Sequence, residues 1–329
     1  MGEASETNWI LNGAVIALAG TAAAVTGLAL YARHKLKPKI HWSSPKTLDG
    51  LTIVVTGGNS GIGAATVTDL ARRNANVIIA SRTASSSNEL IDEIKKKYPN
   101  SHVSFEHLDL SSLASAKEFV QNLSAPNVDI LVNNAGVWGS PVPKSADGIE
   151  TTFAVNYLGP FYLTKLMFEK YKMERVINVS SGLYTRGQID PDNLEILLEA
   201  PENPDKDKYR EMYSTSKLGN IYFTLQLAEE HPETCALALH PGLCYTSLAR
   251  YVAPKSKIAK FLGKLLPLII RTPEEGAMTV EYCCVEDGLL SGSYFGDCQR
   301  EELKPVATDQ TTQSKLWEFS EQVLKRFGY

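Results

Sequence analysis

The sequence predicts an α/β fold: one doubly wound domain with a mostly parallel, seven-stranded sheet, preceded by an N-terminal transmembrane helix. From residue 51 onward, short runs rich in Val, Ile and Leu alternate with amphipathic helical patterns. This alternation is typical of a parallel sheet covered by helices on both faces. Right-handed crossover connections then favour the doubly wound topology.

Six segments have the length and composition of buried strands, and a helical pattern occupies 88–98, between the second and third of them. The predicted strands are 51–56, 76–81, 102–108, 128–133, 175–180 and 235–240. No stretch inside 51–329 has the composition of a domain linker. We therefore predict one domain over 51–300, followed by a C-terminal segment over 301–329.

The N-terminal region has a different character. Residues 9–31 carry no charged side chain, and about 20 apolar residues suffice to cross a bilayer. Acidic residues precede this run and basic residues follow it, the reverse of a secretory signal peptide. We expect a tail over 1–8, a single-pass anchor over 9–31 and a basic linker over 32–50, with the domain that follows in the cytosol. A cleaved signal or a buried core helix is the alternative.

Composition narrows the class of protein. The formal net charge is −4 over 329 residues, which argues against a general nucleic-acid binder. The five cysteines show no metal-ligand spacing, so no metal site is expected. An odd number of cysteines also suggests a reduced compartment.

The turn TGGNSGIG, residues 56–63, joins the first predicted strand to a helix. Glycines allow a tight turn and a close approach to phosphate, and the helix N-terminus favours an anion. At the end of the second strand, where NAD sites place an acid, Ser81 and Arg82 stand instead. A guanidinium group suits an additional phosphate, which favours NADP(H) over NAD(H). The alternative for Arg82 is an ordinary surface residue.

Four motifs in order carry a resemblance. They are TGGNSGIG at 56–63, NNAG at 133–136, YSTSK at 213–217 and HPG at 240–242. Over about residues 48–300 the chain resembles the short-chain dehydrogenase/reductase family. The stretches VINVSSGLYTRG, TPEEGAMTVEY and SGSYFGDC are similar to the retinol dehydrogenase branch, including its WW-domain oxidoreductase-like members. These proteins are often membrane-anchored, and the likeness makes the endoplasmic reticulum the expected location. A lipid droplet and the mitochondrial outer membrane are the alternatives.

The resemblance implies a Rossmann-type dinucleotide site. The implied cofactor-binding residues are Thr56, Gly57, Asn59, Ser60, Gly61, Ile62 and Gly63 in the turn, Arg82 at the 2′-phosphate, Asp109 beside the adenine, Asn133, Ala135 and Gly136 under the adenosine half, Tyr213 and Lys217, and Pro241, Gly242 and Thr246 beside the nicotinamide.

The resemblance also implies four catalytic roles. Asn156 supports a proton relay, Ser181 holds the substrate oxygen, Tyr213 is the acid/base and Lys217 bonds the nicotinamide ribose. Ser180 is the rival for the serine role. Two charges about 4 Å apart, at an effective dielectric constant of about 20, interact by roughly 4 kcal/mol. We therefore expect Lys217, together with an oxidised nicotinamide, to lower the pKa of the Tyr213 phenol by about three from its usual value near 10.

Two segments bear on the substrate. The acidic insertion 187–210 lengthens the gap between Ser181 and Tyr213, and we expect it to lie over the substrate mouth. A substrate lid is expected over about 245–272. Within it, 255–270 has apolar and lysine-rich faces, a pattern that suits either a membrane surface or an ordinary core-facing helix.

Together these features predict a membrane-anchored oxidoreductase that transfers hydride between NADP(H) and a lipophilic alcohol or carbonyl compound. The expected substrates are retinoid-, steroid- or lipid-aldehyde-like. The preference for retinal or a similar lipid aldehyde rests on the resemblance. The alternatives are an NAD-linked steroid dehydrogenase and, in a different class, a non-catalytic nucleotide-binding scaffold. Homo-oligomerisation is left open.

Overall fold

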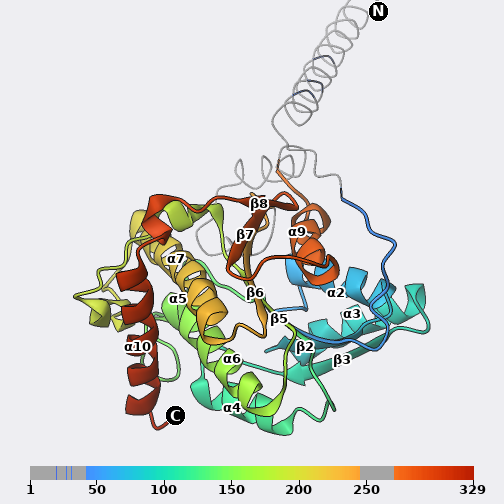
Figure 1. The fold of residues 1–329 in the computed structure, drawn as a ribbon, viewed down its shortest axis with the longest axis horizontal. Helices are drawn as coiled ribbons and strands as arrows, with labels where there is room; N and C mark the ends of the chain where they lie inside the picture. The colour runs from blue at the N-terminus through green and yellow to red at the C-terminus, as the bar shows by residue number, and fades with distance from the viewer. Residues whose placement is uncertain (1–19, 21–26, 28–30, 32–41, 245–269) are drawn as a thin grey trace, which may run out of the picture.

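The computed structural model describes residues 20, 27, 31, 42–244 and 270–329 (Figure 1). Nearly all of the expected anchor over 9–31, and most of the expected lid over 245–272, lie outside the described residues, as does the amphipathic segment apart from residue 270. Within the described part of the chain, no helix combines the length and the apolar character that crossing a bilayer requires.

One sheet organises the domain, and its strands run in the order β3-β2-β1-β4-β5-β6-β7-β8. The strands are β1 Thr52–Thr56, β2 Asn76–Ser81, β3 His102–His107, β4 Ile130–Asn133, β5 Arg175–Val179, β6 Cys235–His240, β7 Ser293–Gly296 and β8 Gln299–Glu301. The six predicted strands all form, with ends that differ by at most two residues. The prediction of seven strands is wrong by one, because the chain turns back after β7 and adds β8 as the antiparallel edge.

Helices cover the sheet on both sides (Figure 1). The α-helices are α2 Gly61–Arg72, α3 Ala84–Lys97, α4 Leu113–Asn122, α5 Thr151–Phe153, α6 Gly159–Lys170, α7 Lys206–Glu230, α9 Pro273–Val285 and α10 Gln310–Arg326. A π-helical turn, Ala154–Leu158, joins α5 to α6. Short 3-10 helices occur at Gly182–Arg186, Leu194–Leu198 and Pro305–Ala307.

The apolar strands feed two cores. In β1, Ile53 and Val55 pack with α2, α3 and α9 on one face. Val54, between them, packs with α4, α6, α7 and α10 on the other. Because successive side chains of a strand point to opposite faces, a strand with a core on each side must be apolar throughout. This explains the continuous apolar runs in the sequence and confirms the doubly wound α/β architecture.

The insertion 187–210, before Tyr213, packs against the body of the domain. The backbone N–H of Glu150 donates to the carbonyl oxygen of Leu198 at 2.9 Å. Ion pairs join Asp192 to Lys315 at 2.7 Å and Glu195 to Arg326 at 2.5 Å, both with α10. Leu194 is buried in the core beneath. The insertion therefore packs beside α7 and α10, because its apolar residues find a core there. The expectation that it lies over the substrate mouth stays a prediction.

The part of the linker that the structure describes is bound to the domain. The buried guanidinium of Arg73 donates to the carbonyl oxygens of Ser44 and Lys46. The indole N–H of Trp42 donates to Glu286 Oε1 at 2.8 Å. The chain thus enters the domain along α2 and α9.

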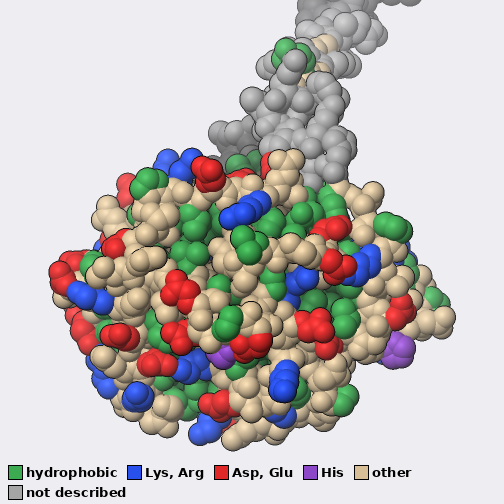
Figure 2. All heavy atoms as spheres, viewed as in Figure 1, with side chains coloured by type: hydrophobic (Ala, Val, Ile, Leu, Met, Phe, Trp, Pro, Cys, Tyr) green, Lys and Arg blue, Asp and Glu red, His purple; other side chains and the backbone are tan. Residues whose placement is uncertain are grey.

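Figure 2 shows acidic and basic side chains intermingled over the visible face.

Candidate active site

A cleft of about 440 Å³ opens at the carboxyl ends of the parallel strands. It lies where the strand order reverses between β1 and β4, which is the usual ligand site of open α/β sheets. Its described lining comprises Gly57, Asn59, Ser60, Gly61, Ile62, Gly63, Ala80, Ser81, Arg82, Thr83, Leu108, Asp109, Leu110, Asn134, Ala135, Gly136, Val137, Val155, Val179, Ser180, Tyr213, Lys217 and Pro241. Most of the predicted cofactor-binding residues are therefore brought together.

The glycine turn between β1 and α2 leaves no room for side chains. A Cβ on Gly63 would overlap the carbonyl oxygen of Gly57 and lie 2.6 Å from Asn134 Nδ2. Gly57 has φ +64°, and a Cβ there would lie 3.0 Å from Ala135 Cα. The glycines therefore allow the turn to pack directly against the end of β4.

The helix that follows the turn offers a binding site for an anion. Ser60 is the N-cap of α2 in an extended conformation, and its side chain makes no capping hydrogen bond. The first amide N–H groups of a helix lack partners inside the helix and carry the positive end of its dipole. A pyrophosphate fits here, so the residues present suit a dinucleotide.

Thr56 and Asn134 hold this end of the cleft together. Thr56 Oγ1 accepts hydrogen bonds from the backbone N–H groups of Asn134 and Ala135, both at 3.0 Å. Asn134 Nδ2 donates to the Thr56 carbonyl oxygen at 2.8 Å. Thr56 itself is fully buried, so it braces the turn from behind instead of lining the cleft.

Asn133 is placed differently from the expectation. Its Nδ2 donates to Thr164 Oγ1 at 3.1 Å and to Asn178 Oδ1 at 2.9 Å, in a buried network between β4, β5 and α6. Asn134, and not Asn133, lines the cleft beside Ala135 and Gly136. The alternation of side chains along β4 explains the difference. Asn133, the last residue of the strand, points toward the helix layer, and Asn134, the next residue, reaches the cleft.

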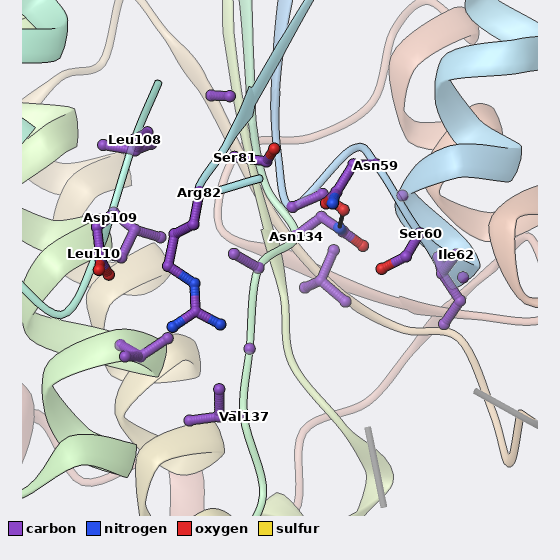
Figure 3. A pocket seen from close by; sticks show the side chains of 18 of the residues that line it. Asn59, Ser60, Ile62, Ser81, Arg82, Leu108, Asp109, Leu110, Asn134 and Val137 are labelled. Carbon is purple, nitrogen blue, oxygen red and sulfur yellow. Dashed lines mark hydrogen bonds between the residues drawn. The ribbon is translucent and has the colours of Figure 1, made fainter. Parts of the chain in front are cut away.

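Arg82 extends from the end of β2 into the cleft (Figure 3). It is exposed, and no described residue hydrogen-bonds or pairs with its guanidinium. The neighbouring Ser81 is buried and bonds Ser87 Oγ at 2.9 Å. Asp109 lies across the cleft from Ser60 (Figure 3), with Oδ1 accepting from Ser111. An unpaired cation at this place suits a phosphate.

Tyr213 and Lys217 lie at the other end of the cleft, on α7. Lys217 Nζ donates to the carbonyl oxygen of Val179 at 2.8 Å and lies 5.8 Å from the centre of the Tyr213 ring. The side chain of Ser181 hydrogen-bonds Tyr213. Ser180 Oγ instead donates to the Lys217 carbonyl oxygen at 2.7 Å. The geometry therefore favours Ser181 over Ser180 as the serine beside the phenol.

Burial dominates the pKa of Tyr213, and Lys217 is not among the groups that shift it. The lowering expected from Lys217 together with an oxidised nicotinamide stays a prediction. Burial raises the pKa of Tyr213 to about 12, partly opposed by the Ser181 hydrogen bond. Burial also lowers the pKa of Lys217 to about 7. Both groups lie in the low-dielectric interior, and the ammonium bonds Val179 and not the phenol oxygen. Desolvation therefore favours the neutral form of each side chain.

Asn156 lies in the π-helical turn between α5 and α6 and is 1% exposed. Its Oδ1 accepts from the Val137 N–H at 2.8 Å, and its Nδ2 donates to the Val137 carbonyl oxygen at 3.0 Å and to Ser216 Oγ at 3.0 Å. Short π-helical segments are frequent at functional sites. Asn156 thus ties the loop after β4 to the helix that carries Tyr213 and Lys217.

Trp138 was not identified from the sequence. Its indole stacks on the Tyr213 ring, with centroids 5.1 Å apart and planes inclined by 19°. The ring of Tyr213 is therefore in contact with Trp138 as well as near Lys217. The available signal was its position two residues after the NNAG motif, at the end of β4.

The remaining predicted residues follow β6. Pro241 lines the cleft. Gly242 lies just behind it, with φ +76°. Thr246 lies outside the described residues. The cleft thus joins a glycine turn and an exposed arginine to a buried phenol and amine.

Comparison with known proteins identifies the family. Residues 51–189 match the family model described as short chain dehydrogenase. The chain is 35% identical over 336 residues to retinol dehydrogenase 14 of Homo sapiens, covering 94% of this chain and 98% of that protein. It is 37% identical over 288 residues to human retinol dehydrogenase 12, covering 84% and 87%.

The fold has relatives among solved structures. A crystal structure of an uncharacterized protein from Mycobacterium paratuberculosis matches with a TM-score of 0.67 and 29% identity, over 85% of this chain and 95% of that one. The order of the motifs, the cleft and the similarity to known proteins all indicate the same family. The chain belongs to the short-chain dehydrogenase/reductase family, with retinol dehydrogenases among its relatives, and is an NAD(P)-dependent oxidoreductase that acts on CH–OH groups.

Proposed function

We propose that this protein transfers hydride between NADP(H) and a lipophilic alcohol or carbonyl compound, with Tyr213 as the acid/base. The observation that carries the proposal is the single cleft that joins the glycine turn after β1 to Tyr213 and Lys217 on α7. A dinucleotide that begins at the N-terminus of α2 extends along this cleft toward the phenol. A scaffold would have no use for a buried phenol and amine at its far end.

The chemistry of the side chains follows from their positions. When bound, the nicotinamide supplies hydride in reduction and accepts it in oxidation. Tyr213 gives its phenolic proton to the substrate oxygen in reduction and takes it back in oxidation. Ser181, hydrogen-bonded to Tyr213, holds the same oxygen in place. Lys217 binds the ribose hydroxyls, and Asn156 supports proton exchange behind them.

The choice of NADP(H) rests on Arg82. Its guanidinium projects into the cleft, and no described residue pairs with it (Figure 3). Such a group binds a phosphate through charge-assisted hydrogen bonds. The proposal of a lipophilic substrate is supported by relatives that bear the name retinol dehydrogenase. The proposed membrane anchor over 9–31 is supported by the apolar N-terminal run. We further propose that this anchor lies in the endoplasmic reticulum membrane, with the domain in the cytosol.

A panel of retinal, steroid ketones and long-chain aldehydes, assayed with NADPH and NADH using the full chain in detergent, tests the proposal. Tyr213→Phe should lower kcat by about 100-fold or more, because the proton donor is lost, while NADPH binding stays within about twofold. Tyr209→Phe, one turn earlier on the same helix, is the matched control and should keep wild-type turnover. Equal turnover by the wild type and Tyr213→Phe would refute the mechanism. Binding of NADPH without turnover of any panel member would favour the scaffold.

The direction of the pH dependence follows from the raised pKa of Tyr213. With this pKa near 12, the phenol is protonated at neutral pH and ready to donate a proton in reduction. Oxidation needs the phenolate, whose fraction rises with pH below that value. The rate of alcohol oxidation should therefore rise between pH 8 and 10 by up to about tenfold per pH unit, while reduction changes little. Initial rates with a slow substrate measure this, and a flat oxidation profile would contradict it.

A further inference from the structure

The turn that follows β6 is held from two sides. Pro241 lines the cleft at the end that holds Tyr213. Its carbonyl oxygen accepts a hydrogen bond from Arg271 Nη1 at 2.9 Å. The backbone N–H of Gly242, the next residue, donates to His240 Nδ1 at 3.1 Å. Cys244 Sγ also donates to the Pro241 carbonyl oxygen at 3.2 Å, and the backbone N–H of Arg271 donates to the Leu243 carbonyl oxygen at 3.0 Å. The amide of Gly242 itself is held by His240.

The arginine contact does not depend on pH. The Arg271 side chain is 5% exposed, and its Nη2 bonds Asp297 Oδ1 at 2.5 Å. Gly242 has φ +76°, and a Cβ there would overlap the Arg271 guanidinium. An arginine stays charged in proteins, so the carbonyl side of the turn is always held. The amide side is held by a group that titrates.

The hydrogen bonds assign the tautomer of His240. Nδ1 accepts from the Gly242 N–H, so it carries no proton, and Nε2 carries the proton of the neutral ring. Nε2 faces Glu301, at 3.3 Å from Oε1 and 3.4 Å from Oε2. A carboxylate at one ring nitrogen fixes the proton there and leaves the other nitrogen free to accept. Glu301 therefore supports the His240–Gly242 bond from β8.

The sheet makes room for this contact. A Cβ on Gly296, in β7, would overlap both Glu301 Oε1 and His240 Nε2. Any other residue at 296 would thus separate the carboxylate from the imidazole. The antiparallel strand β8 brings Glu301 beside Tyr294, one strand from β6. The strand that the sequence did not predict is the element that supplies the carboxylate.

We propose that Glu301 and His240 form a positioning pair that holds the Pro241–Gly242 turn in the shape that binds the dinucleotide, and that protonation of His240 releases it. When Nδ1 gains a proton, two N–H groups face each other and the bond to Gly242 is lost. Dinucleotide affinity then falls in acid while Arg271 keeps its contact. This inference rests on the proposed dinucleotide site and adds a pH-dependent control of it.

Charges of both signs lie around the turn. The Glu301 carboxylate on β8 faces Nε2 of His240, and the Arg271 guanidinium holds the other side of the turn. Asp297 is paired with Arg271, and Tyr294 on β7 packs against the His240 ring with centroids 5.6 Å apart. Histidine ordinarily changes charge between about pH 5 and 8, so this is the range to examine.

The test measures the Kd of NADH from pH 5.5 to 8 by titration of intrinsic fluorescence, using the full chain in detergent. NADH is the probe because it lacks the 2′-phosphate, which itself titrates near pH 6. The wild type should bind about fivefold more weakly at pH 5.5 than at pH 7.5, the loss of one hydrogen bond. His240→Asn, whose Oδ1 accepts in place of Nδ1 and does not titrate, should bind within about twofold of wild type at pH 7.5 with a flat profile.

Two further variants complete the test. His240→Leu lacks the acceptor and should bind about fivefold more weakly at every pH. Glu301→Ala removes the acceptor that faces Nε2 and should weaken NADH binding at pH 7.5, by less than His240→Leu does, because the ring loses the contact that orients it. Thermal unfolding of each variant checks that the fold persists. Coincident profiles of the wild type and His240→Asn, or wild-type affinity in His240→Leu, would overturn the inference alone. A wild type that binds neither NADH nor NADPH would overturn the proposed function as well.

Discussion

The two ends of the cleft are built by different means. At the glycine end the turn after β1 presents backbone, and its one long cation, Arg82, is exposed. At the tyrosine end the work is done by side chains that are almost fully buried: Asn156 is 1% exposed, Lys217 3% and Tyr213 5%. A site made of backbone depends on close packing, so an added side-chain atom weakens binding. A site made of buried polar side chains depends on their mutual hydrogen bonds, so it loses function when one of these side chains is removed.

The largest effect should come from adding one carbon to the glycine end. Gly63→Ala places a methyl group against the Gly57 carbonyl oxygen and Asn134, so the turn must shift. We expect the dinucleotide Kd to rise about 100-fold, measured by calorimetric titration. Gly182→Ala is the matched control, because a Cβ there meets nothing within 4 Å. Wild-type affinity in Gly63→Ala would show that the turn does not bind the cofactor.

A smaller and selective effect should follow from removing the exposed cation. Arg82→Gln should weaken NADPH binding about tenfold and leave NADH binding unchanged, because a charge-assisted bond to the 2′-phosphate is lost. The ratio of KM values for the two cofactors measures it. An equal loss for both cofactors would point to a general electrostatic role. Unchanged binding of both cofactors would show that Arg82 is an ordinary surface residue and would favour the NAD-linked alternative.

The smallest effect should come from the aromatic neighbour of the phenol. Trp138→Leu removes the ring that stacks on Tyr213, a contact worth about 1 kcal/mol. We expect kcat to fall about fivefold with little change in cofactor affinity. Stopped-flow measurement of the chemical step checks this, with Trp138→Phe as the variant that keeps an aromatic ring and most of the rate. A larger fall in cofactor affinity than in kcat would contradict this. It would show that Trp138 acts in cofactor binding, as the glycine turn does, and not in the chemical step.

The glycine end was largely predictable from the sequence, because its signals are local. A strand, a glycine turn and a helix follow one another within residues 52–72, and the backbone of a few consecutive residues makes the site. The tyrosine end was predictable only in part. Tyr213 and Lys217 share a helix, so their spacing gave their proximity. Resemblance supplied the choice of Ser181.

What the sequence missed depends on contacts between distant segments. Asn133 and Asn134 look alike, and only the register of β4 decides which one reaches the cleft. The raised pKa of Tyr213 depends on its burial, which spacing alone does not reveal. The insertion packs against α10, more than 100 residues later, so its own composition could not predict its place. The same holds for Glu301, which meets His240 through an unpredicted edge strand.

The most direct test of the account is a crystal structure of the chain with NADP⁺ bound. The account predicts the pyrophosphate at the N-terminus of α2, the 2′-phosphate beside Arg82, and the nicotinamide between Pro241 and the hydroxyl group of Tyr213. A dinucleotide bound in this cleft with its nicotinamide remote from Tyr213, or bound elsewhere on the protein, would contradict it.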